Sequence, residues 1–538
     1  MPQEKKKDGS VEAVKLPIVT TSVCPECLKI ITATIFEDDG KIWIKKKCDE
    51  HGEVVELYWG SADMFKRAST FAYDGRGVEN PNVAKANPVC PKDCGLCSLH
   101  KSHTALANLV VTNRCDLNCW YCFFFAKRAG YVYEPSLEEL RKAVKLLRDE
   151  KPVPGNALQI TGGEPSLRND ILDIIKMTKE EGVEHVQYNT NGIRFSQDPE
   201  FVAKLRESGI NTVYLSFDGV TPQTNPKNHY EIPQVLENSR KAGVGLVLVP
   251  TIIKGVNDSE LGDILRFGFR NMDVVRGVNY QPVSLVGRMP RKERDKHRIT
   301  IPDVIQRIEE QTGGAISKDD FYPVPSMKVI TDFVESLVKK PQYSLSTHFA
   351  CGMATYVFED NGKMLPITRF IDLGGLFEYV EEQAGELQKG KSKYVVGAKM
   401  LFRLNSFIDK DAAPKGFSLG KIIYDALMKH DYSSLGAFHR KSLFVGMMHF
   451  MDLYNYDIER VKRCCIHYLT PEAIIPFCAF NVIPEWYRDS VQNKYGVSFE
   501  DWEKTTGRTM RSDMYQHDAE TLKNSELYRK TYEGFLKE

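Results

Sequence analysis

The sequence lacks an excess of charge of either sign. Its 538 residues contain 72 Lys and Arg against 72 Asp and Glu, so the formal net charge at pH 7 is zero. Proteins that cover nucleic acid normally carry a basic excess, and we therefore expect no nucleic-acid partner. No run of about 18 apolar residues occurs either, which argues against a hydrophobic membrane-spanning helix.

The N-terminus has no recognisable secretion signal. Residues 1–7 are mostly polar or charged and no apolar segment follows them, so we expect a cytoplasmic protein. In that reducing compartment, clustered cysteines bind metals more often than they form disulfides. The chain has 13 cysteines, most of them in groups, and these groups predict several metal sites.

The most informative group has the spacing C-x₃-C-x₂-C and consists of Cys115, Cys119 and Cys122. Soft thiolate ligands select iron–sulfur clusters or zinc. Three thiolates can hold three corners of a [4Fe–4S] cube and leave the fourth iron open to a small chelating ligand. The alternative is a structural zinc knuckle.

A ribbon-type metal site is predicted near the N-terminus. Cys24 and Cys27 form one CxxC knuckle, and Cys48 with His51 forms a second knuckle after a strand-like hairpin. Two knuckles at this separation hold a single ion in tetrahedral sites. The ion is either zinc or a rubredoxin-like iron.

A second C-x₃-C-x₂-C group precedes the first by eighteen residues. No strand-like run leads into it, so we interpret it as an auxiliary iron–sulfur site rather than the principal one. His100 and His103 are nearby candidates for its fourth ligand. The three cysteines of this group are Cys90, Cys94 and Cys97.

The C-terminal part has a further set of cysteines far apart in the sequence. Cys351, Cys464 and Cys478 are predicted to bind another iron centre, with Cys465 or His467 as the fourth ligand. Buried free cysteine is the alternative, because cysteine is common in protein cores.

Between the two metal-rich parts, six strand-like segments alternate with five helical ones. This alternation predicts a parallel sheet in an α/β fold, a partial (β/α)₆ TIM barrel with reacting groups at the carboxyl ends of its strands. The strands are expected at 108–113, 157–161, 185–189, 212–217, 245–252 and 276–283. The helices are expected near 136–149, 169–181, 198–208, 231–242 and 258–270.

Small and polar residues follow the second, third and fourth strands, and an apolar segment that could contact adenine begins at the end of the fifth; these are the candidate cofactor-binding residues. For Asn191 and Asp218, each followed by glycine, ordinary turn chemistry is an equal alternative. The candidates are Gly162, Gly163 and Glu164 after the second strand, Asn189 and Asn191 after the third, Ser216 and Asp218 after the fourth, and Val249 after the fifth.

We predict four regions along the chain. Residues 1–20 form a disordered tail, 21–104 a metal-ribbon and auxiliary-cluster domain, 105–285 the barrel, and 286–538 a C-terminal α+β iron–sulfur domain. The most apolar stretch, 443–454, is interpreted either as a buried helix or as lining for a long alkyl chain. The charged last sixty residues are expected to cover the surface.

The cysteine motif with Tyr121 before its third cysteine, and the Gly-Gly-Glu segment after the second strand, closely resemble the radical S-adenosylmethionine (SAM) superfamily. Over about residues 20–485 the motifs resemble one archaeal family, tetraether lipid synthase. The resemblance implies SAM bound to the Cys115 cluster, with Tyr121 and the strand-end residues around it. It also implies two auxiliary [4Fe–4S] clusters and one rubredoxin-like iron.

The implied reaction begins with a 5′-deoxyadenosyl radical that removes hydrogen from an unactivated C–H bond. In this family it joins the terminal methyl carbons of two phytanyl chains into a biphytanyl lipid. The expected partners are an archaeal diether or tetraether lipid, a low-potential donor such as ferredoxin, and the membrane surface as a peripheral contact.

Two other functions remain open at this point. One is a radical SAM C-methyltransferase acting on a methanopterin-type pterin precursor, which predicts a polar pocket instead of a long apolar tunnel. The other is an electron-transfer or metal-storage protein, which the SAM-pocket motifs disfavour because an electron carrier has no use for them.

Overall fold

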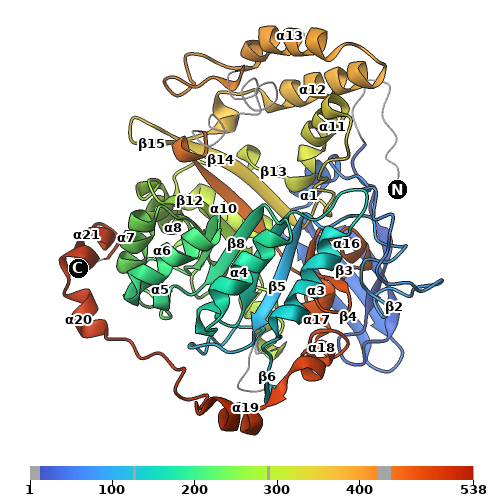
Figure 1. Cartoon of the computed structure of the whole chain (residues 1–538). Helices are drawn as coiled ribbons and strands as arrows, with labels where there is room; N and C mark the ends of the chain where they lie inside the picture. The colour runs from blue at the N-terminus through green and yellow to red at the C-terminus, as the bar shows by residue number, and fades with distance from the viewer. Residues whose placement is uncertain (1–11, 125–128, 288–290, 421–437, 537–538) are drawn as a thin grey trace.

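The computed structural model describes residues 12–124, 129–287, 291–420 and 438–536. Its framework is a 13-stranded mixed sheet with helices packed on it, and a separate four-stranded sheet lies beside this framework (Figure 1). Residues 1–11 of the predicted N-terminal tail lie outside the described residues.

The four-stranded sheet is an antiparallel meander close to the N-terminus. The predicted hairpin is confirmed, and Asp39 and Gly40 form its turn with positive φ angles of 48° and 67°. The strands are β1 (Ile18–Val23), β2 (Ile30–Asp38), β3 (Lys41–Cys48) and β4 (Gly52–Trp59).

The predicted partial barrel is confirmed. Six parallel strands lie side by side in chain order, and helices connect them. The strands are β5 (Leu106–Thr112), β7 (Ala157–Gly162), β8 (His185–Thr190), β9 (Thr212–Ser216), β10 (Gly245–Val249) and β12 (Val275–Pro282). The main connecting helices are α3 (Leu137–Arg148), α4 (Ile171–Glu180), α6 (Pro199–Ser208), α7 (Ile232–Ala242) and α8 (Leu261–Arg270).

Local sequence explains where these helices begin and end. Ser136 and Glu139 form a capping box at the start of α3, which satisfies two backbone N–H groups that the helix leaves unpaired. Asp198 caps α6 by accepting a hydrogen bond from the backbone of Phe201 at 2.9 Å. Gly209 ends α6 in the left-handed region, with φ of 113°, where a side chain would be strained.

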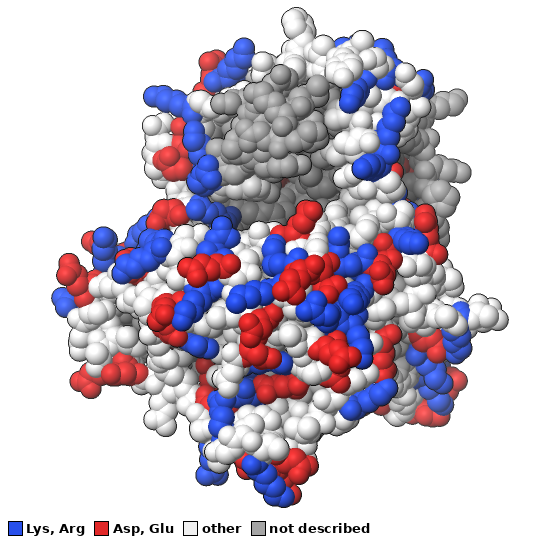
Figure 2. Space-filling model, viewed as in Figure 1, with Lys and Arg blue, Asp and Glu red and all other residues white. Residues whose placement is uncertain are grey.

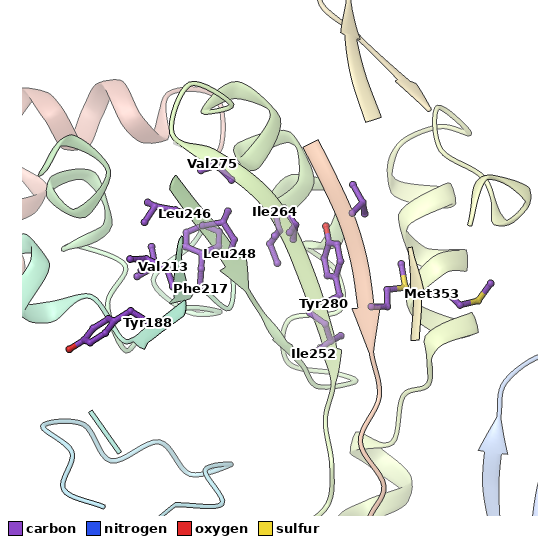
Figure 3. Packing of buried hydrophobic residues seen from close by; sticks show 14 of the residues in the cluster. Tyr188, Val213, Phe217, Leu246, Leu248, Ile252, Ile264, Val275, Tyr280 and Met353 are labelled. Carbon is purple, nitrogen blue, oxygen red and sulfur yellow. The ribbon is translucent and has the colours of Figure 1, made fainter. Parts of the chain in front are cut away.

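The barrel core lies between the sheet and its helices. Val213, Leu246 and Leu248 project from neighbouring strands toward Phe217 and Ile264, and all five side chains are completely buried (Figure 3). Each such side chain contributes about 1.5–3 kcal/mol when it leaves water. This packing fixes the strand ends that carry the candidate site residues.

The C-terminal part of the chain extends the sheet at both of its ends. β16 (Ser442–Met448) pairs in parallel with β12, and β17 (Ile466–Leu469) pairs in parallel with β5. β14 (Gly352–Asp360) then pairs antiparallel with β16. Strands of the C-terminal part therefore share a sheet with the barrel, and the domain boundary at residue 285 stays a prediction.

The interpretation of residues 443–454 as a buried helix is wrong. Their first half lies in β16, which has neighbouring strands on both sides and is mostly buried. Strands buried on both faces have continuous apolar sequence, so periodicity does not distinguish them from buried helices.

Charged residues of both signs are interspersed over the face of the molecule drawn in Figure 2, without a broad patch of one sign.

Among the helices of the described residues, none has the length and apolar character needed to cross a bilayer.

The four-stranded sheet docks on the C-terminal part through buried polar contacts. Both carboxylate oxygens of Asp457 accept hydrogen bonds from this sheet, one from the Thr20 hydroxyl at 2.7 Å and one from the Tyr58 hydroxyl at 2.8 Å. Lys46 donates to the backbone carbonyl of Leu453 at 2.6 Å.

Substitution Asp457→Ala leaves two buried hydroxyl groups without an acceptor, and we expect it to lower the free energy of unfolding by about 2–4 kcal/mol. Denaturant unfolding measures the change. Asp319→Ala is the control, because it removes a largely exposed ion pair with Arg67 and should cost less than about 0.5 kcal/mol. Equal effects of the two substitutions would contradict this role for Asp457.

Candidate active site

A cavity of about 390 Å³ opens at the carboxyl ends of the barrel strands. Most of the residues predicted to bind the principal cluster and SAM line it, whereas Glu164 and Asp218 do not. Those that line it are Cys115, Cys119, Cys122, Tyr121, Gly162, Gly163, Asn189, Asn191, Ser216 and Val249.

The end of β7 lies against the segment that leads into Cys115. The backbone N–H of Gly163 donates to the carbonyl of Thr112 at 2.8 Å, and that of Glu164 donates to the carbonyl of Arg114 at 2.7 Å. A Cβ atom on Gly162 would lie 2.1 Å from the Thr112 oxygen, and one on Gly163 would lie 2.0 Å from the Arg114 oxygen. Both positions therefore require glycine.

The Glu164 carboxylate is buried and bonded within the protein. It accepts hydrogen bonds from the backbone of Ser166 at 3.0 Å, from the Thr190 hydroxyl at 2.9 Å and from the backbone of Asn191 at 2.8 Å. Burial, together with the charge of Asp116, raises the pKa of Glu164 to about 7. Its contact with SAM stays a prediction, and in the structure it joins the ends of β7 and β8.

Asn191, at the end of β8, contacts the loop that carries Cys115, Cys119 and Cys122, which we call the cysteine loop (residues 113–122). Its side-chain amide donates to the Asp116 carboxylate at 2.6 Å, next to Cys115, and its oxygen accepts from the backbone of Ile193 at 2.9 Å. The alternatives for Asn191 were ligand contact and turn chemistry. The side chain caps the local turn and also anchors the loop that carries the cysteines.

Asp218 contacts the same loop at its other end. Its carboxylate pairs with the ammonium of Lys227 at 2.6 Å, accepts from the hydroxyl of Tyr121, and accepts from the backbone of Thr251 at 2.9 Å. Lys227 lies 2.9 Å from the Tyr121 hydroxyl and lines the cavity. Sequence reasoning missed Lys227, because its loop has no local motif; the only available signal was the short separation from Asp218.

The three thiols at the cavity suit a cationic iron–sulfur cluster. Burial raises the pKa of Cys122 to about 12 and that of Cys115 well above its ordinary value. The ligating form of cysteine is the thiolate, so metal binding has to offset this rise. Three thiols that line one cavity with Gly162 and Gly163 are a donor set that fits the cluster and its SAM ligand.

The ribbon site is fully assembled. The ligand atoms of Cys24, Cys27, Cys48 and His51 all lie within 4.8 Å of one another. Individual separations are 3.7 Å from Cys24 Sγ to His51 Nδ1, 3.6 Å from Cys48 Sγ to His51 Nδ1, and 3.8 Å between the sulfurs of Cys27 and Cys48. A tetrahedron with metal–sulfur bonds of about 2.3 Å has edges of about 3.8 Å, so these four residues fit one ion.

His51 also prepares Cys48 for metal binding. Its hydrogen bond lowers the pKa of the Cys48 thiol to about 6, which favours the thiolate at neutral pH. Within the part of the chain that the structure describes, this is the only set of three or more such ligand atoms drawn so close together.

The two predicted auxiliary sets lie near each other. Cys94 and Cys478 belong to one buried cluster, and Cys90 and Cys464 pack against it. How the cysteines divide between clusters stays a prediction.

The histidines considered as fourth ligands have other partners. His100 Nε2 lies 2.8 Å from the Cys464 carbonyl and 3.1 Å from His467 Nε2, and His467 Nδ1 lies 3.0 Å from the Thr104 hydroxyl. His103 Nε2 accepts from the backbone of Ser344 at 2.9 Å. These hydrogen bonds disfavour all three as ligands in this conformation.

Arg460 supports an anionic site at the C-terminal cysteines. Its guanidinium group is buried. It donates hydrogen bonds to the Cys351 sulfur at 3.3 Å and to the His449 carbonyl at 2.7 Å. None of the ion pairs formed among the described residues gives it a carboxylate partner. Because arginine stays charged, a metal-bound thiolate at Cys351 would supply the negative charge within hydrogen-bonding distance of this guanidinium.

Comparison with known proteins places the chain in a family. The radical SAM superfamily model matches residues 109–268, and a model described as the HMPTM N-terminal zinc ribbon domain matches residues 17–60. A 7,8-dihydro-6-hydroxymethylpterin dimethyltransferase of Methanocaldococcus jannaschii is 47% identical over 496 residues, which cover 90% of this chain and 97% of that protein. The chain belongs to this radical SAM family.

More distant relatives of this radical SAM protein match a smaller share of its chain. A GTP 3′,8-cyclase of Aquifex aeolicus is 28% identical over 226 residues, 40% of this chain and 65% of that protein. A solved methylornithine synthase superposes with a TM-score of 0.28 and 16% identity over 33% of this chain and 53% of that chain.

The prediction that this protein is a tetraether lipid synthase is wrong. The relative that matches 90% of this chain is named as a pterin methyltransferase, and the matching ribbon model is described as HMPTM. The lipid substrate, the joining of phytanyl chains and the membrane contact are corrected with it. The motifs that suggested them are cluster and SAM motifs, which say nothing about what else enters the cavity. Radical SAM chemistry with [4Fe–4S] and SAM remains.

We expect Gly163→Ala to displace the Cys115 loop, because the added methyl group meets the Arg114 carbonyl. The reconstituted protein should lose the SAM-dependent change in the EPR spectrum of its reduced cluster. Gly385→Ala, on a helix with nothing within 4 Å of the added carbon, is the control. A Gly163→Ala protein that binds SAM as the wild type does would contradict the role of this close approach.

Dialysis against a chelator tests the ribbon. Cys48→Ala should lose one equivalent of zinc or iron that the wild type retains, and its ribbon should become sensitive to protease, because metal binding and folding are coupled in such sites. Glu26→Ala changes an exposed residue between Cys24 and Cys27 and should retain the ion. Equal metal content in all three proteins would count against the site.

Proposed function

We propose that this protein is a radical SAM C-methyltransferase whose substrate is a reduced pterin of the 6-hydroxymethyl class. The substrate class follows from the dihydrohydroxymethylpterin dimethyltransferase that is 47% identical over 90% of the chain. In this structure, the residues that line the cavity support the proposal.

One wall of the cavity bears amide side chains from strands that are far apart in the sequence. Asn108 comes from β5, Gln159 from β7, Asn189 from β8, and Asn279 and Gln281 from β12. Each amide offers both a donor and an acceptor. A pterin presents an amino group, ring nitrogens and a carbonyl along one edge, which such a wall can pair.

Three of these amides are available for a ligand. Asn108 donates to the His467 carbonyl and Asn189 to the Thr161 hydroxyl, each at 3.3 Å. Gln159, Asn279 and Gln281 have no hydrogen-bonded side-chain partner in the described portion of the protein. They therefore supply the unpaired donors and acceptors that a polar heterocycle would satisfy.

Aromatic side chains also line the cavity, and Phe123 and Phe124 among them directly follow Cys122. Phe450 stacks on Phe477 with ring centroids 3.9 Å apart, and Tyr468 lies 5.1 Å from Phe477. Flat rings of this kind exclude water and favour a flat substrate. Amide groups and aromatic rings in one cavity suit a planar molecule with a polar edge.

In the proposed enzyme Cys115, Cys119 and Cys122 hold the SAM-binding [4Fe–4S] cluster, with Tyr121, Gly162, Gly163, Asn189, Asn191, Ser216 and Val249 around SAM. The reduced cluster with bound SAM supplies radical chemistry at unreactive carbon. The protein orients the pterin, excludes water, and holds the cluster loop through Asp218 and Lys227. A C–H bond of the pterin is replaced by C–CH₃, so a one-carbon donor is required.

The remaining metal sites are proposed as electron carriers. Cys90, Cys94 and Cys97 with Cys351, Cys464 and Cys478 would hold two auxiliary clusters, and a low-potential donor such as a ferredoxin would supply electrons. The ribbon holds a mononuclear ion.

The test is to incubate reconstituted enzyme with SAM, a low-potential reductant, a one-carbon donor and 7,8-dihydro-6-hydroxymethylpterin. We expect the pterin to gain CH₂ units in mass while 5′-deoxyadenosine forms. Gln159→Leu should weaken pterin binding by about tenfold, the loss expected for one buried hydrogen bond, with SAM binding unchanged.

Gln306→Leu on the exposed surface is the matched control. If the pterin returns without added carbon, or if Gln159→Leu and Gln306→Leu bind it equally well, the proposed substrate is wrong.

A further inference from the structure

The last part of the chain crosses the molecule as a single extended segment, which we call the C-terminal strap (residues 497–532). It begins with β19 (Val497–Ser498), which pairs with β6 (Tyr131–Val132), and continues through α19 (Phe499–Thr506). It ends with α20 (Ala519–Lys523) and α21 (Glu526–Tyr532). Figure 1 shows it in red, passing from α19 along the lower edge of the molecule to α20 and α21 near α7.

The strap binds the residues on either side of Cys115. Asp513 forms an ion pair with Arg114 at 2.7 Å, and the side chains of both are almost fully buried, with exposed fractions of 0% and 3%. The Arg114 guanidinium also lies over the Trp502 ring, 4.9 Å from its centroid. On the other side of Cys115, the carbonyl of Asp116 accepts from the backbone N–H of Tyr515 at 3.0 Å.

The strap also binds the segment that carries Lys227, which we call the Lys227 segment (residues 227–231). The buried Glu231 carboxylate accepts from the Tyr515 hydroxyl at 2.9 Å and lies 2.8 Å from His517 Nδ1. Further along, the Tyr532 hydroxyl donates to the His229 carbonyl at 2.8 Å, and the Tyr528 hydroxyl lies 2.8 Å from His229 Nε2.

These contacts connect two sides of one cavity from outside. Cys115 and Lys227 both line the cavity, whereas no strap residue does. The Tyr515 side chain and its own backbone N–H reach the two segments simultaneously. Movement of the strap would therefore change the separation between the cysteine loop and the Lys227 segment.

We propose that the strap is a positioning element for SAM binding, with Asp513 and Tyr515 as its positioning residues. They fix the Cys115 loop against the Lys227 segment, so that the cavity between them is formed before SAM enters. The inference concerns SAM and not the pterin, so it stands apart from the proposed methyl transfer.

The principal variant is Asp513→Asn, which keeps the shape of the side chain and removes its charge. Arg114 keeps a second carboxylate partner, Glu134, at 2.8 Å, so the protein should still fold. We expect the dissociation constant for SAM, measured by equilibrium dialysis of the reconstituted full-length enzyme, to rise by about tenfold. Asp513→Glu retains the charge and should restore most of the affinity.

A second readout uses protein without iron. Hydrogen exchange of the backbone amides in residues 112–122 should become faster in Asp513→Asn, because the loop loses its outer anchor. Tyr515→Phe removes only the hydroxyl contact with Glu231 and should produce a smaller change of the same kind. It also keeps the proposal testable if Asp513→Asn does not fold.

Tyr495→Phe is the matched control, since it removes one tyrosine hydroxyl contact with a carboxylate, that of Glu472 at 3.0 Å, outside the strap. It should change neither SAM affinity nor exchange in residues 112–122. The proposal is overturned if Asp513→Asn and Tyr515→Phe match Tyr495→Phe in both measurements, or if they lower the melting temperature while SAM affinity and loop exchange stay as in the wild type.

Discussion

The close approach of two backbones, which only glycine permits, underlies the whole site. At Gly162 and Gly163 the end of β7 lies so near the residues before Cys115 that any side chain would meet a carbonyl oxygen about 2 Å away. The two hydrogen bonds made there fix the start of the cysteine loop on the rigid barrel. The side-chain contacts of Asn191, Asp218 and Lys227 then position the rest of this loop, whose first residues are already fixed.

Those contacts come from polar side chains bonded to one another inside the protein. Asn191 reaches Asp116, and Asp218 with Lys227 reaches Tyr121, so the loop is held on both sides of its cysteines. Hydrogen bonds and ion pairs are stronger away from water, and they also give a unique geometry. The site is thus shaped by residues that hold the loop as much as by those that line the cavity.

Sequence patterns predicted the barrel and the ribbon well, because both are encoded locally. Alternating strands and helices, capping residues and CxxC spacings each lie within a few residues of one another. Lys227 and Arg460 could not be found in this way, since their partners are set by the fold. The strand β16 was missed because its apolar run has no period, and the substrate was mistaken because the cavity amides are distributed over four strands between residues 108 and 281.

The two C-terminal strands that flank the barrel strands, β16 and β17, have a consequence for how this chain folds. Ile466 of β17 pairs with Leu106 of β5, about 360 residues earlier, and β16 pairs with β12 across more than 160 residues. During synthesis both edges of the barrel sheet wait unpaired until the ribosome has made most of the chain. Open edges are templates for intermolecular pairing, and such distant contacts form slowly. The nascent barrel is therefore the stage at which this protein most needs protection from aggregation.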